Sequence, residues 1–220
     1  MGIHHLKDGM IAGMILGDGH LKQETPCLRL SHTSPQTNYL LFKLSLASQV
    51  GYETKRYHDS VLNTNLGQRS YCTGVIRKGD IAKFYGMDLD TLLWNLNPLG
   101  LLLWWLDDGC LIIHKKQNGS ISRFGYLNTQ GYGLAENQLI QQRLFEKFGL
   151  ETSIHIDSKS GFAKSDLFRI YLNATNLRRL IDFVREFIPW IPINMRYKFN
   201  MAYVANRLEK SEYFVENYNF

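Results

Sequence analysis

The chain has 220 residues, 45% of them hydrophobic and 13% aromatic, so it is long and apolar enough to bury a sizeable core and is not predicted to be disordered. Lys and Arg number 25 against 20 Asp and Glu, and this net charge of +5 favours a polyanionic partner. The longest apolar run, Leu99–Leu106, is too short to span a bilayer, and MGIHHLKDGM lacks the apolar core of a signal peptide. Three cysteines without a C-x-x-C pair argue against a disulfide framework, so we expect an intracellular setting. The short apolar runs predict no membrane partner.

The first predicted helix contains the stretch Ile11–Gly19, IAGMILGDG, which ends on Asp18. Asp-Gly is a common turn pair, but a carboxylate at a helix C-terminus is opposed by the helix dipole by about 0.3–1 kcal/mol. The same break recurs at Leu101–Gly109, LLLWWLDDG, which ends on Asp107 and Asp108. Two breaks of one local rule in one chain indicate a shared functional cause.

The two stretches belong to an internal repeat. Leu40–Thr54 resembles Leu139–Thr152, because both have helix-period apolar positions, a Gly exit and a following Glu-Thr. Arg69–Thr73, RSYCT, matches Arg169–Asn173, RIYLN, and each is followed by a helical pattern, DIAKFY in the first copy and LRRLIDFVREF in the second. We expect the extra residues of the second copy to lie in the polar stretch Lys115–Ser120.

Each repeat reads as helix, hairpin, helix, hairpin, helix, so the predicted fold class is α+β, an αββαββα unit duplicated with pseudo-two-fold symmetry. We assign residues 1–98 to the first repeat and connecting segment, and residues 99–220 to the second repeat and a helical C-terminal tail after Asn200. The connecting segment Gly86–Pro98 lacks the Ser/Gly-rich composition of a flexible linker, so the repeats are expected to form one body.

The motif helices have complementary residues for a close contact. Gly13 and Gly17 lie four apart on one face of the first helix and allow a partner backbone to approach. The second helix is bulky in its middle, at Leu103, Trp104 and Trp105, and core packing is the favoured interpretation of the two tryptophans.

IAGMILGDG and LLLWWLDDG resemble the two signature helices of the LAGLIDADG homing endonucleases, and the duplicated order from Asp8 to Phe199 agrees with that family. YLNTQ (Tyr126–Gln130) and IPINMRYKF (Ile191–Phe199) are similar to its monomeric, double-motif, intron-encoded branch. The resemblance implies two antiparallel sheets forming a DNA-binding saddle with two central motif helices. It also implies a Mg²⁺-dependent endodeoxyribonuclease that acts as a monomer, in a bacterial cytoplasm or a DNA-containing organelle, and breaks both strands of a long, specific duplex site.

The resemblance assigns metal binding and catalysis to the residue before each motif's final Gly, which is Asp18 in the first motif and Asp108 in the second. Asp107 and Gly17, which match each other, are secondary metal candidates. Two carboxylates brought together need a cation between them, and such oxygen ligands suit Mg²⁺. Mn²⁺ is expected to substitute for it, and Ca²⁺ to bind without cleavage.

Lys198, in MRYKF, falls where the similar branch has a catalytic lysine. The first repeat offers no clear equivalent, because Lys83 comes too early and Met87 stands near the expected place. Nicking or unequal cleavage of the two strands is therefore an alternative to a balanced double-strand break.

Alternating strands leave one face free to lie on a duplex, where polar side chains read base edges or grip phosphates. The predicted DNA-binding residues are Lys22, Arg29, Ser31, Thr33, Lys55, Arg56, Arg69, Tyr71, Thr73, Lys115, Lys116, Arg123, Tyr126, Asn128, Gln130, Arg169, Tyr171 and Asn173. For any one of them an ordinary solvated strand face is at least as good an interpretation, so the hypothesis rests on the set. The histidines form no metal motif, and His32, His58, His114 and His155 are interpreted as DNA contacts or plain surface residues.

Two other functions remain open on the same fold. An RNA-splicing maturase would bind intron RNA and would not need the carboxylate pair, so Asp18 and Asp108 disfavour it. A catalytically inactive DNA-binding regulator is favoured only by the missing first-repeat lysine. No Gly-rich nucleotide loop is present in the sequence, so no ATP dependence is expected.

Overall fold

The computed structural model describes residues 3–22, 24, 26–57, 59–64, 67–77, 79–115, 117–157 and 167–199. The chain divides into two compact units. The first runs to Asp108 and takes in Ile191–Met195, and the second runs from Gly109 to Trp190 and resumes at Arg196. Lys116, His58 and the helical tail predicted after Asn200 lie outside the described residues.

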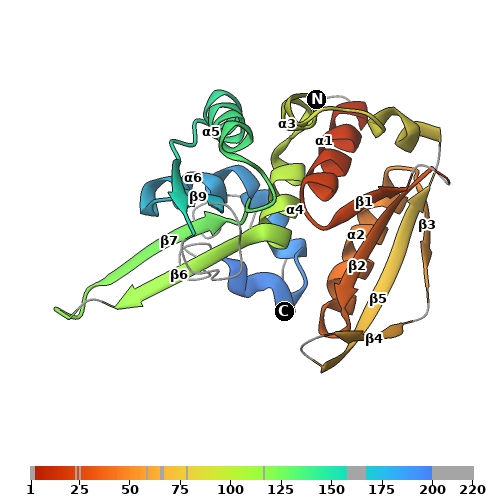
Figure 1. Ribbon diagram of the computed structural model, residues 1–220, viewed down its shortest axis with the longest axis horizontal. Helices are drawn as coiled ribbons and strands as arrows, with labels where there is room; N and C mark the ends of the chain where they lie inside the picture. The colour runs from red at the N-terminus through yellow and green to blue at the C-terminus, as the bar shows by residue number, and fades with distance from the viewer. Residues whose placement is uncertain are drawn as a thin grey trace, which may run out of the picture. The chain divides into compact units, whose positions relative to one another are not determined.

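The first unit is built on an antiparallel sheet. Its elements up to the sheet's last strand are α1 (Ile3–Leu16), β1 (Gly19–Lys22), β2 (Cys27–Thr33), η1 (Ser34–Gln36), α2 (Thr37–Gln49), β3 (Glu53–Arg56), β4 (Ser60–Thr64) and β5 (Gly67–Arg77). The strand order is β1-β2-β5-β3, and β4 pairs with the far end of β5 (Figure 1). The sequence predicts a simple hairpin here, but along one edge the long strand β5 pairs with both β3 and β4.

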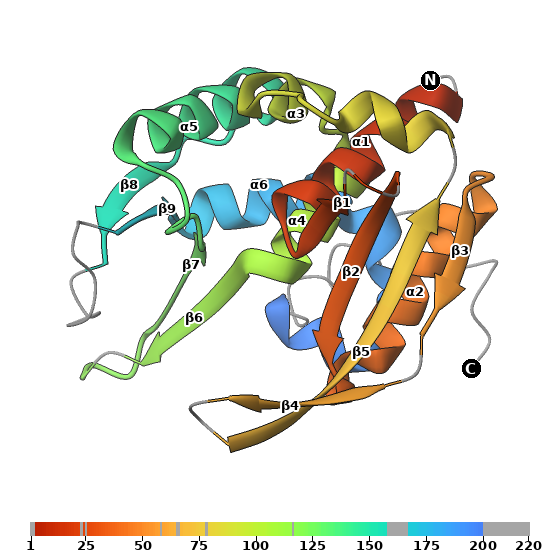
Figure 2. The ribbon, with the colours of Figure 1, turned by 45° about the vertical axis from the view of Figure 1, so that its right-hand side comes forward.

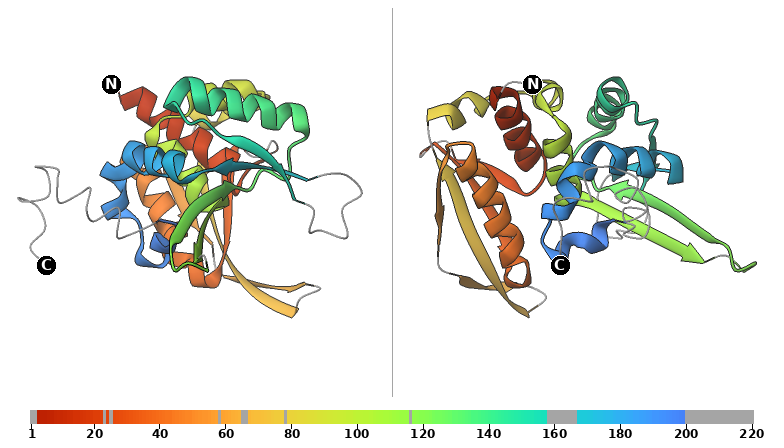
Figure 3. Two further views of the ribbon diagram at one scale, coloured as in Figure 1. Left: turned by 90° about the vertical axis from the view of Figure 1, so that its left-hand side faces the viewer. Right: turned by 180° about the vertical axis from the view of Figure 1, so that it is seen from behind.

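Helix α2 covers one face of this sheet (Figure 3, right). Leu28 and Leu30 of β2 point to that face and are fully buried. Residue 74 of β5 must be small there, because a Cβ on Gly74 would lie 2.8 Å from the Leu44 side chain of α2. The apolar side chains thus alternate along β2 and β5, and the opposite face carries the polar ones.

The first unit continues through η2 (Gly79–Phe84), α3 (Leu89–Asn95) and α4 (Pro98–Asp108). The prediction of a last first-repeat helix at DIAKFY is wrong in detail, because that segment forms a 3₁₀ turn and the α-helix follows in the segment predicted as a connector. Asp88 caps α3 by accepting from the Thr91 N–H at 2.8 Å. Leu92 and Leu93 then bury its apolar face.

Helices α1 and α4 pack against each other (Figure 2), and they meet at small residues. A Cβ on Gly13 would lie 2.0 Å from the Gly100 carbonyl oxygen, and a Cβ on Gly100 would lie 1.9 Å from that of Gly9. The predicted close approach at Gly13 is confirmed, and α4 contributes a glycine of its own. Trp104 and Trp105 are fully buried, which confirms their assignment to the core.

We expect Gly13→Ala to lower the free energy of unfolding by about 1–3 kcal/mol, because the added methyl meets backbone that cannot move aside without separating the two helices. Gly131→Ala is the matched control, since a Cβ there would meet nothing within 4 Å. Urea unfolding of both variants measures the difference. Equal stability of the two variants would show that the helix crossing has room for a side chain.

The second unit is built on a smaller antiparallel sheet of order β6-β7-β9-β8. Its elements are β6 (Gly109–Lys115), β7 (Ile121–Leu127), α5 (Leu134–Phe148), β8 (Ser153–Ile156), β9 (Phe168–Leu172), α6 (Ala174–Val184) and η3 (Arg185–Trp190), and η4 (Ile193–Lys198) spans the return between the units. Leu127, Ile170 and Leu172 bury one face of the sheet beneath α5 and α6 (Figure 1).

From α4 onward the chain order is helix, two strands, helix, two strands, helix, as predicted for the second repeat. Helix α4 nevertheless belongs to the first unit, where it packs against α1. The division between residues 98 and 99 therefore stays a prediction of where the sequence repeat begins, and the compact units divide after Asp108. No helix in the described ranges combines the length and the apolar character needed to cross a membrane.

Candidate functional site

The end of the first motif lies directly against the second motif helix. Helix α1 ends at Leu16, and Asp18 stands between it and β1. The Asp18 backbone N–H donates to Asp107 Oδ2 at 3.1 Å. A Cβ on Gly17 would lie 2.2 Å from that same oxygen, so glycine is required for the carboxylate to approach the turn. Gly17 has no side-chain atom that could bind a metal, and its role at this site is to leave room for the Asp107 carboxylate.

The Asp107 carboxylate is compensated by the protein itself. Its side chain is fully buried, and Lys43 Nζ of α2, also fully buried, donates to its two oxygens at 2.6 and 2.7 Å. The Tyr39 hydroxyl donates to Oδ1 at 2.8 Å. With the Asp18 N–H, these contacts use the roughly four acceptor positions of a carboxylate. For Asp107, the positive charge expected beside the motif carboxylates is therefore the ammonium group of Lys43.

Sequence reasoning missed Lys43 and Tyr39. The signal was present, because Lys43 falls on the apolar stripe of α2 with Leu40, Leu44 and Ala47. A lysine at such a position is rarely buried unless it is paired. Its partner, however, lies 64 positions further along the chain, and nothing local to α2 identifies it.

The charges of three carboxylates act on the Tyr39 hydroxyl. Its pKa is raised well above 10, first by burial, then by the charge of Asp107 and the hydrogen bond to it, and further by the charges of Asp18 and Asp108. Tyr39 therefore keeps its proton and donates it. Asp108 itself accepts from the Trp104 indole N–H at 3.2 Å. Asp18 and Asp108, the two residues predicted to bind metal, thus both raise the pKa of the Tyr39 hydroxyl through their charge.

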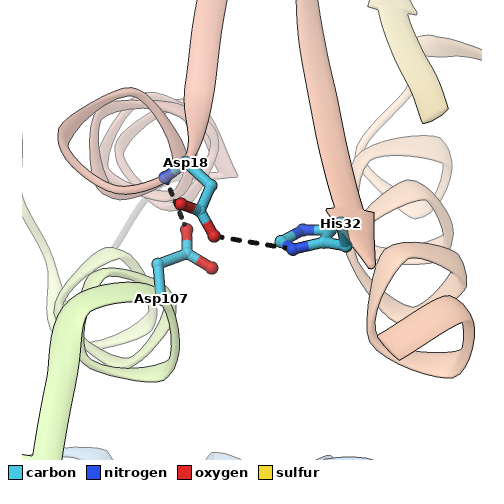
Figure 4. A group of neighbouring side chains, drawn as sticks. All are labelled: Asp18, His32 and Asp107. Carbon is cyan, nitrogen blue, oxygen red and sulfur yellow. Dashed lines mark hydrogen bonds and ion pairs between the residues drawn. The ribbon is translucent and has the colours of Figure 1, made fainter. Parts of the chain in front are cut away.

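His32 faces Asp18 from β2 (Figure 4). The interpretation of His32 as a surface residue or DNA contact is wrong, because it shares the core-facing side of β2 with Leu28 and Leu30. Its Nδ1 lies 3.5 Å from Asp18 Oδ2, and its Nε2 is buried without a hydrogen-bond partner in the described structure. Asp18, His32 and Asp107 each place one potential ligand atom within 4.8 Å of the others.

The His32 imidazole is neutral near pH 7. Burial, followed by the positive charge of Lys43, lowers the pKa of His32 from 6.5 to about 4, although the negative charge of Asp107 opposes this shift. The contact with Asp18 is therefore not an ion pair at neutral pH, and a neutral ring keeps a lone pair on one nitrogen.

Acidification should destabilise the metal-free protein through His32. Because the folded pKa lies below the unfolded one, stability present above pH 6.5 is lost as the pH falls toward 4. Between about pH 7.5 and about pH 5 the loss from this group is about 2 kcal/mol. We expect His32→Phe to lose about 2 kcal/mol less than the wild type over the same interval, measured by urea unfolding in chelator. Parallel losses would show that His32 titrates normally.

Lys198 lies at the start of the second unit's sheet. Its Nζ donates to the Gly109 carbonyl at 2.6 Å, and Gly109 directly follows Asp108 in the chain. Lys83, the early lysine of the first repeat, instead pairs with Asp8 Oδ1 at 2.5 Å.

The predicted DNA-binding rows of the first unit share one sheet face. Arg29, Ser31 and Thr33 lie opposite Val75, Thr73 and Tyr71 in the β2–β5 register, and Arg69 continues the row along β5. All point away from α2. Ser31 and Thr73 are joined through their hydroxyls at 3.3 Å, which buries Thr73. Lys22 and Lys55 are exposed on the flanking strands, and exposed Arg56 pairs with Asp59.

In the second unit the corresponding face carries an aromatic cluster. Tyr126 and Tyr171 are paired across β7 and β9. The Arg169 guanidinium lies 3.9 Å from the centre of the Tyr126 ring, with Nη1 3.7 Å from Asp157. His155 stacks on Tyr171 with ring centroids 4.4 Å apart. These residues are held in place by one another before any ligand arrives.

Other predicted members of this row do not belong to it. Asn173 is the N-cap of α6, accepting from the Asn176 N–H at 2.9 Å. Asn128 and Gln130 follow the end of β7, and Gln130 donates to Asp157. Arg123 lies on the side of β7 that carries Gly125 and Leu127, opposite to Tyr126. Lys115 is exposed at the end of β6. Each deviation comes from a strand that ends earlier, or alternates differently, than the sequence pattern suggests.

Two antiparallel sheets, and helices that end in carboxylates and cross at glycines, define the LAGLIDADG class of fold. The family model of the LAGLIDADG DNA endonucleases matches residues 88–180, from α3 into α6. The solved structure of the homing endonuclease I-WcaI bound to its DNA recognition sequence is similar, with a TM-score of 0.67 and 19% identity over 91% of this chain and 89% of that one. The LAGLIDADG meganuclease I-AabMI bound to uncleaved DNA matches with a TM-score of 0.52, 9% identity and coverage of 92% and 91%.

Among curated proteins, a probable intron-encoded DNA endonuclease 3 of Mycosarcoma maydis is 28% identical over 49% of this chain and 67% of its own length. Protein RecA of Mycolicibacterium flavescens is 26% identical over 73% of this chain, but only 41% of that protein is spanned, and a second RecA, of Mycobacterium shimoidei, is spanned over 26%. Residues 88–180 thus match the LAGLIDADG DNA endonuclease family, and the fold of the chain is that of the solved homing endonucleases.

Proposed function

We propose that this chain is a site-specific homing endonuclease that hydrolyses phosphodiester bonds in duplex DNA with the help of a divalent cation. The observation that carries the proposal is the charge of the motif carboxylates. The charges of Asp18, Asp107 and Asp108 all act on the Tyr39 hydroxyl, and Lys43 is paired with Asp107. Asp18 and Asp108 add two further negative charges, which match the charge of one divalent cation. The DNA-bound state of I-WcaI and the intron-encoded relative support the choice of substrate.

The residues present fit a hard divalent cation. The Asp18 side chain is 46% exposed, so an ion bound to it would be open to solvent and to a substrate phosphate. We propose that Asp18 and Asp108 hold the ion, that Mg²⁺ serves in the cell, that Mn²⁺ replaces it and that Ca²⁺ binds without cleavage. When bound, such an ion stabilises charge on the scissile phosphate and activates the attacking water.

The remaining residues orient this centre. Asp107 is an anchor, because its carboxylate ties the Asp18 backbone, Tyr39 and Lys43 together. Lys198 is our candidate for offsetting phosphate charge beside the second motif. Lys43 and Lys83 of the first repeat are each paired with a carboxylate. We therefore propose unequal cleavage of the two strands, with a nicked intermediate that accumulates.

We further propose that the polar sheet faces bind duplex DNA while the protein is monomeric, in a compartment that holds DNA. On the first unit this face includes Arg29, Arg69 and Tyr71. On the second it includes Tyr126, Arg169 and Tyr171. The side chains that depart from these faces, among them Asn173 and Arg123, are better assigned to the fold or to the flanks of the interface.

Cleavage of a randomised duplex library, with the ends sequenced, tests the function. Ends at one long motif in Mg²⁺, and none in Ca²⁺ or chelator, are the expected result, with one strand cut faster than the other. Binding without cleavage, on a library that contains the natural insertion site, would instead favour the inactive DNA-binding regulator. Selective binding of intron RNA without DNA cleavage would favour the maturase.

A further inference from the structure

His32 occupies a position that normally takes an apolar side chain. It follows Leu28 and Leu30 on the core-facing side of β2, and its side chain is 1% exposed. A buried polar group without a hydrogen bond is destabilising by roughly 1–3 kcal/mol. His32 Nε2 has no such bond in the described structure, and Nδ1 is 3.5 Å from Asp18 Oδ2, longer than a good hydrogen bond. Neither ring nitrogen is well satisfied by protein atoms.

The His32 ring faces a carboxylate through Nδ1, which lies 3.5 Å from Asp18 Oδ2. Asp107 already receives four hydrogen bonds from Lys43, Tyr39 and the Asp18 backbone, so it has no acceptor position left for an ion. Figure 4 shows the His32 ring directed at the side chain of Asp18. Two donors that share one ion, each about 2.1 Å from it, lie roughly 3 Å apart. The separation of His32 and Asp18 is close to that value.

We propose that His32 is a nitrogen ligand of the cation held by Asp18, so that this centre is a mixed nitrogen and oxygen site rather than an all-oxygen one. This inference takes one thing from the proposed function, which is that Asp18 binds a divalent cation. Imidazole binds first-row transition ions more tightly than it binds Mg²⁺. The site should therefore favour Co²⁺ or Zn²⁺ over Mg²⁺ to a degree that carboxylates alone do not give.

The test measures cation binding rather than cleavage. We would titrate the full chain with Co²⁺ and with Mg²⁺ by calorimetry, and record proton NMR spectra of the Co²⁺ form for hyperfine-shifted imidazole signals. The protein used would carry Ala at positions 4 and 5, so that Co²⁺ bound by the adjacent imidazoles of His4 and His5 does not enter the titration. We expect His32→Asn to weaken Co²⁺ binding by about 10–100-fold, with Mg²⁺ binding changed by less than about threefold, and to abolish the shifted imidazole signals.

His114→Asn is the matched control, because His114 is exposed on β6. It should leave both affinities and the NMR signals unchanged. His32→Phe, which keeps the ring volume in the core, should lose Co²⁺ affinity as His32→Asn does, and unfolding curves establish that both variants fold.

The results separate the two proposals. Co²⁺ binding that depends on Asp18 but shows no imidazole signal would overturn the role of His32 and leave the endonuclease intact. An equal loss of Co²⁺ and Mg²⁺ binding in both His32 variants would also overturn it, since a packing role affects both ions. Shifted imidazole signals that depend on His32, in a protein that cleaves no DNA with any ion, would establish the ligand and refute the endonuclease.

Discussion

An Asp18→Asn variant is expected to cleave duplex DNA at least about 10³-fold more slowly than the wild type, which corresponds to roughly 4 kcal/mol of lost transition-state stabilisation. The amide keeps the shape of the side chain and leaves the backbone N–H that donates to Asp107 in place. What it removes is the charge of a carboxylate whose side chain is 46% exposed. Binding of the duplex in Ca²⁺ should be nearly unchanged. Single-turnover cleavage and gel-shift assays on the selected site measure the two effects separately.

Glu186→Gln is the control for this substitution, because it makes the same change of charge at an exposed position of η3. It should cleave as the wild type does. Loss of folding or of DNA binding in Asp18→Asn, in parallel with the loss of cleavage, would make Asp18 a structural residue and remove the support for a cation at this position.

Lys43→Met is expected to lower the free energy of unfolding by about 3–5 kcal/mol, because it leaves a buried carboxylate without its counter-ion. Both partners of this pair have fully buried side chains, so solvent cannot replace the ammonium group. Urea unfolding in chelator is the appropriate measurement. The same substitution at the exposed Lys55 should change the stability by no more than about 0.5 kcal/mol.

The double variant Lys43→Met with Asp107→Asn decides what the loss means. The amide that replaces the Asp107 carboxylate retains a carbonyl oxygen for the Tyr39 hydroxyl and carries no charge, so most of the stability should return. If the double variant is as unstable as the sum of the two single variants, the lysine contributes by packing alone and the ion pair is not the cause.

Much of the architecture could be predicted from the sequence. The Asp-Gly endings and the repeated Glu-Thr after a glycine are local signals, and they correctly located both motif helices and the order of strands around them. The glycines of α1 indicated a close helix contact, which the structure shows at Gly13 and Gly100. Such features are encoded within a few residues of one another, so spacing and periodicity are sufficient to find them.

The environment of the carboxylates could not be predicted in this way. Lys43 meets Asp107 only because α2 and α4 are brought together in the fold. His32 is buried only because the even-numbered side chains of β2 point toward the core. The sequence showed two polar side chains at apolar positions but gave no partner for either. The α-helix at Leu89–Asn95 was missed for a different reason, since its cap and its two buried leucines fall in a segment too short to show helical periodicity.

The ion pair between Lys43 and Asp107 also makes the two repeats unlike in a way that matters for the origin of the chain. In the repeat alignment, Lys43 corresponds to Gln141, 98 positions on, and Asp107 corresponds to Gly17. Both positions that would form the mirror-image pair are uncharged. An assembly of two first repeats would bury Lys43 opposite a glycine, and one of two second repeats would bury Asp107 opposite a glutamine. Each repeat is thus fitted to its unlike partner, and two copies of either repeat could not form this ion pair.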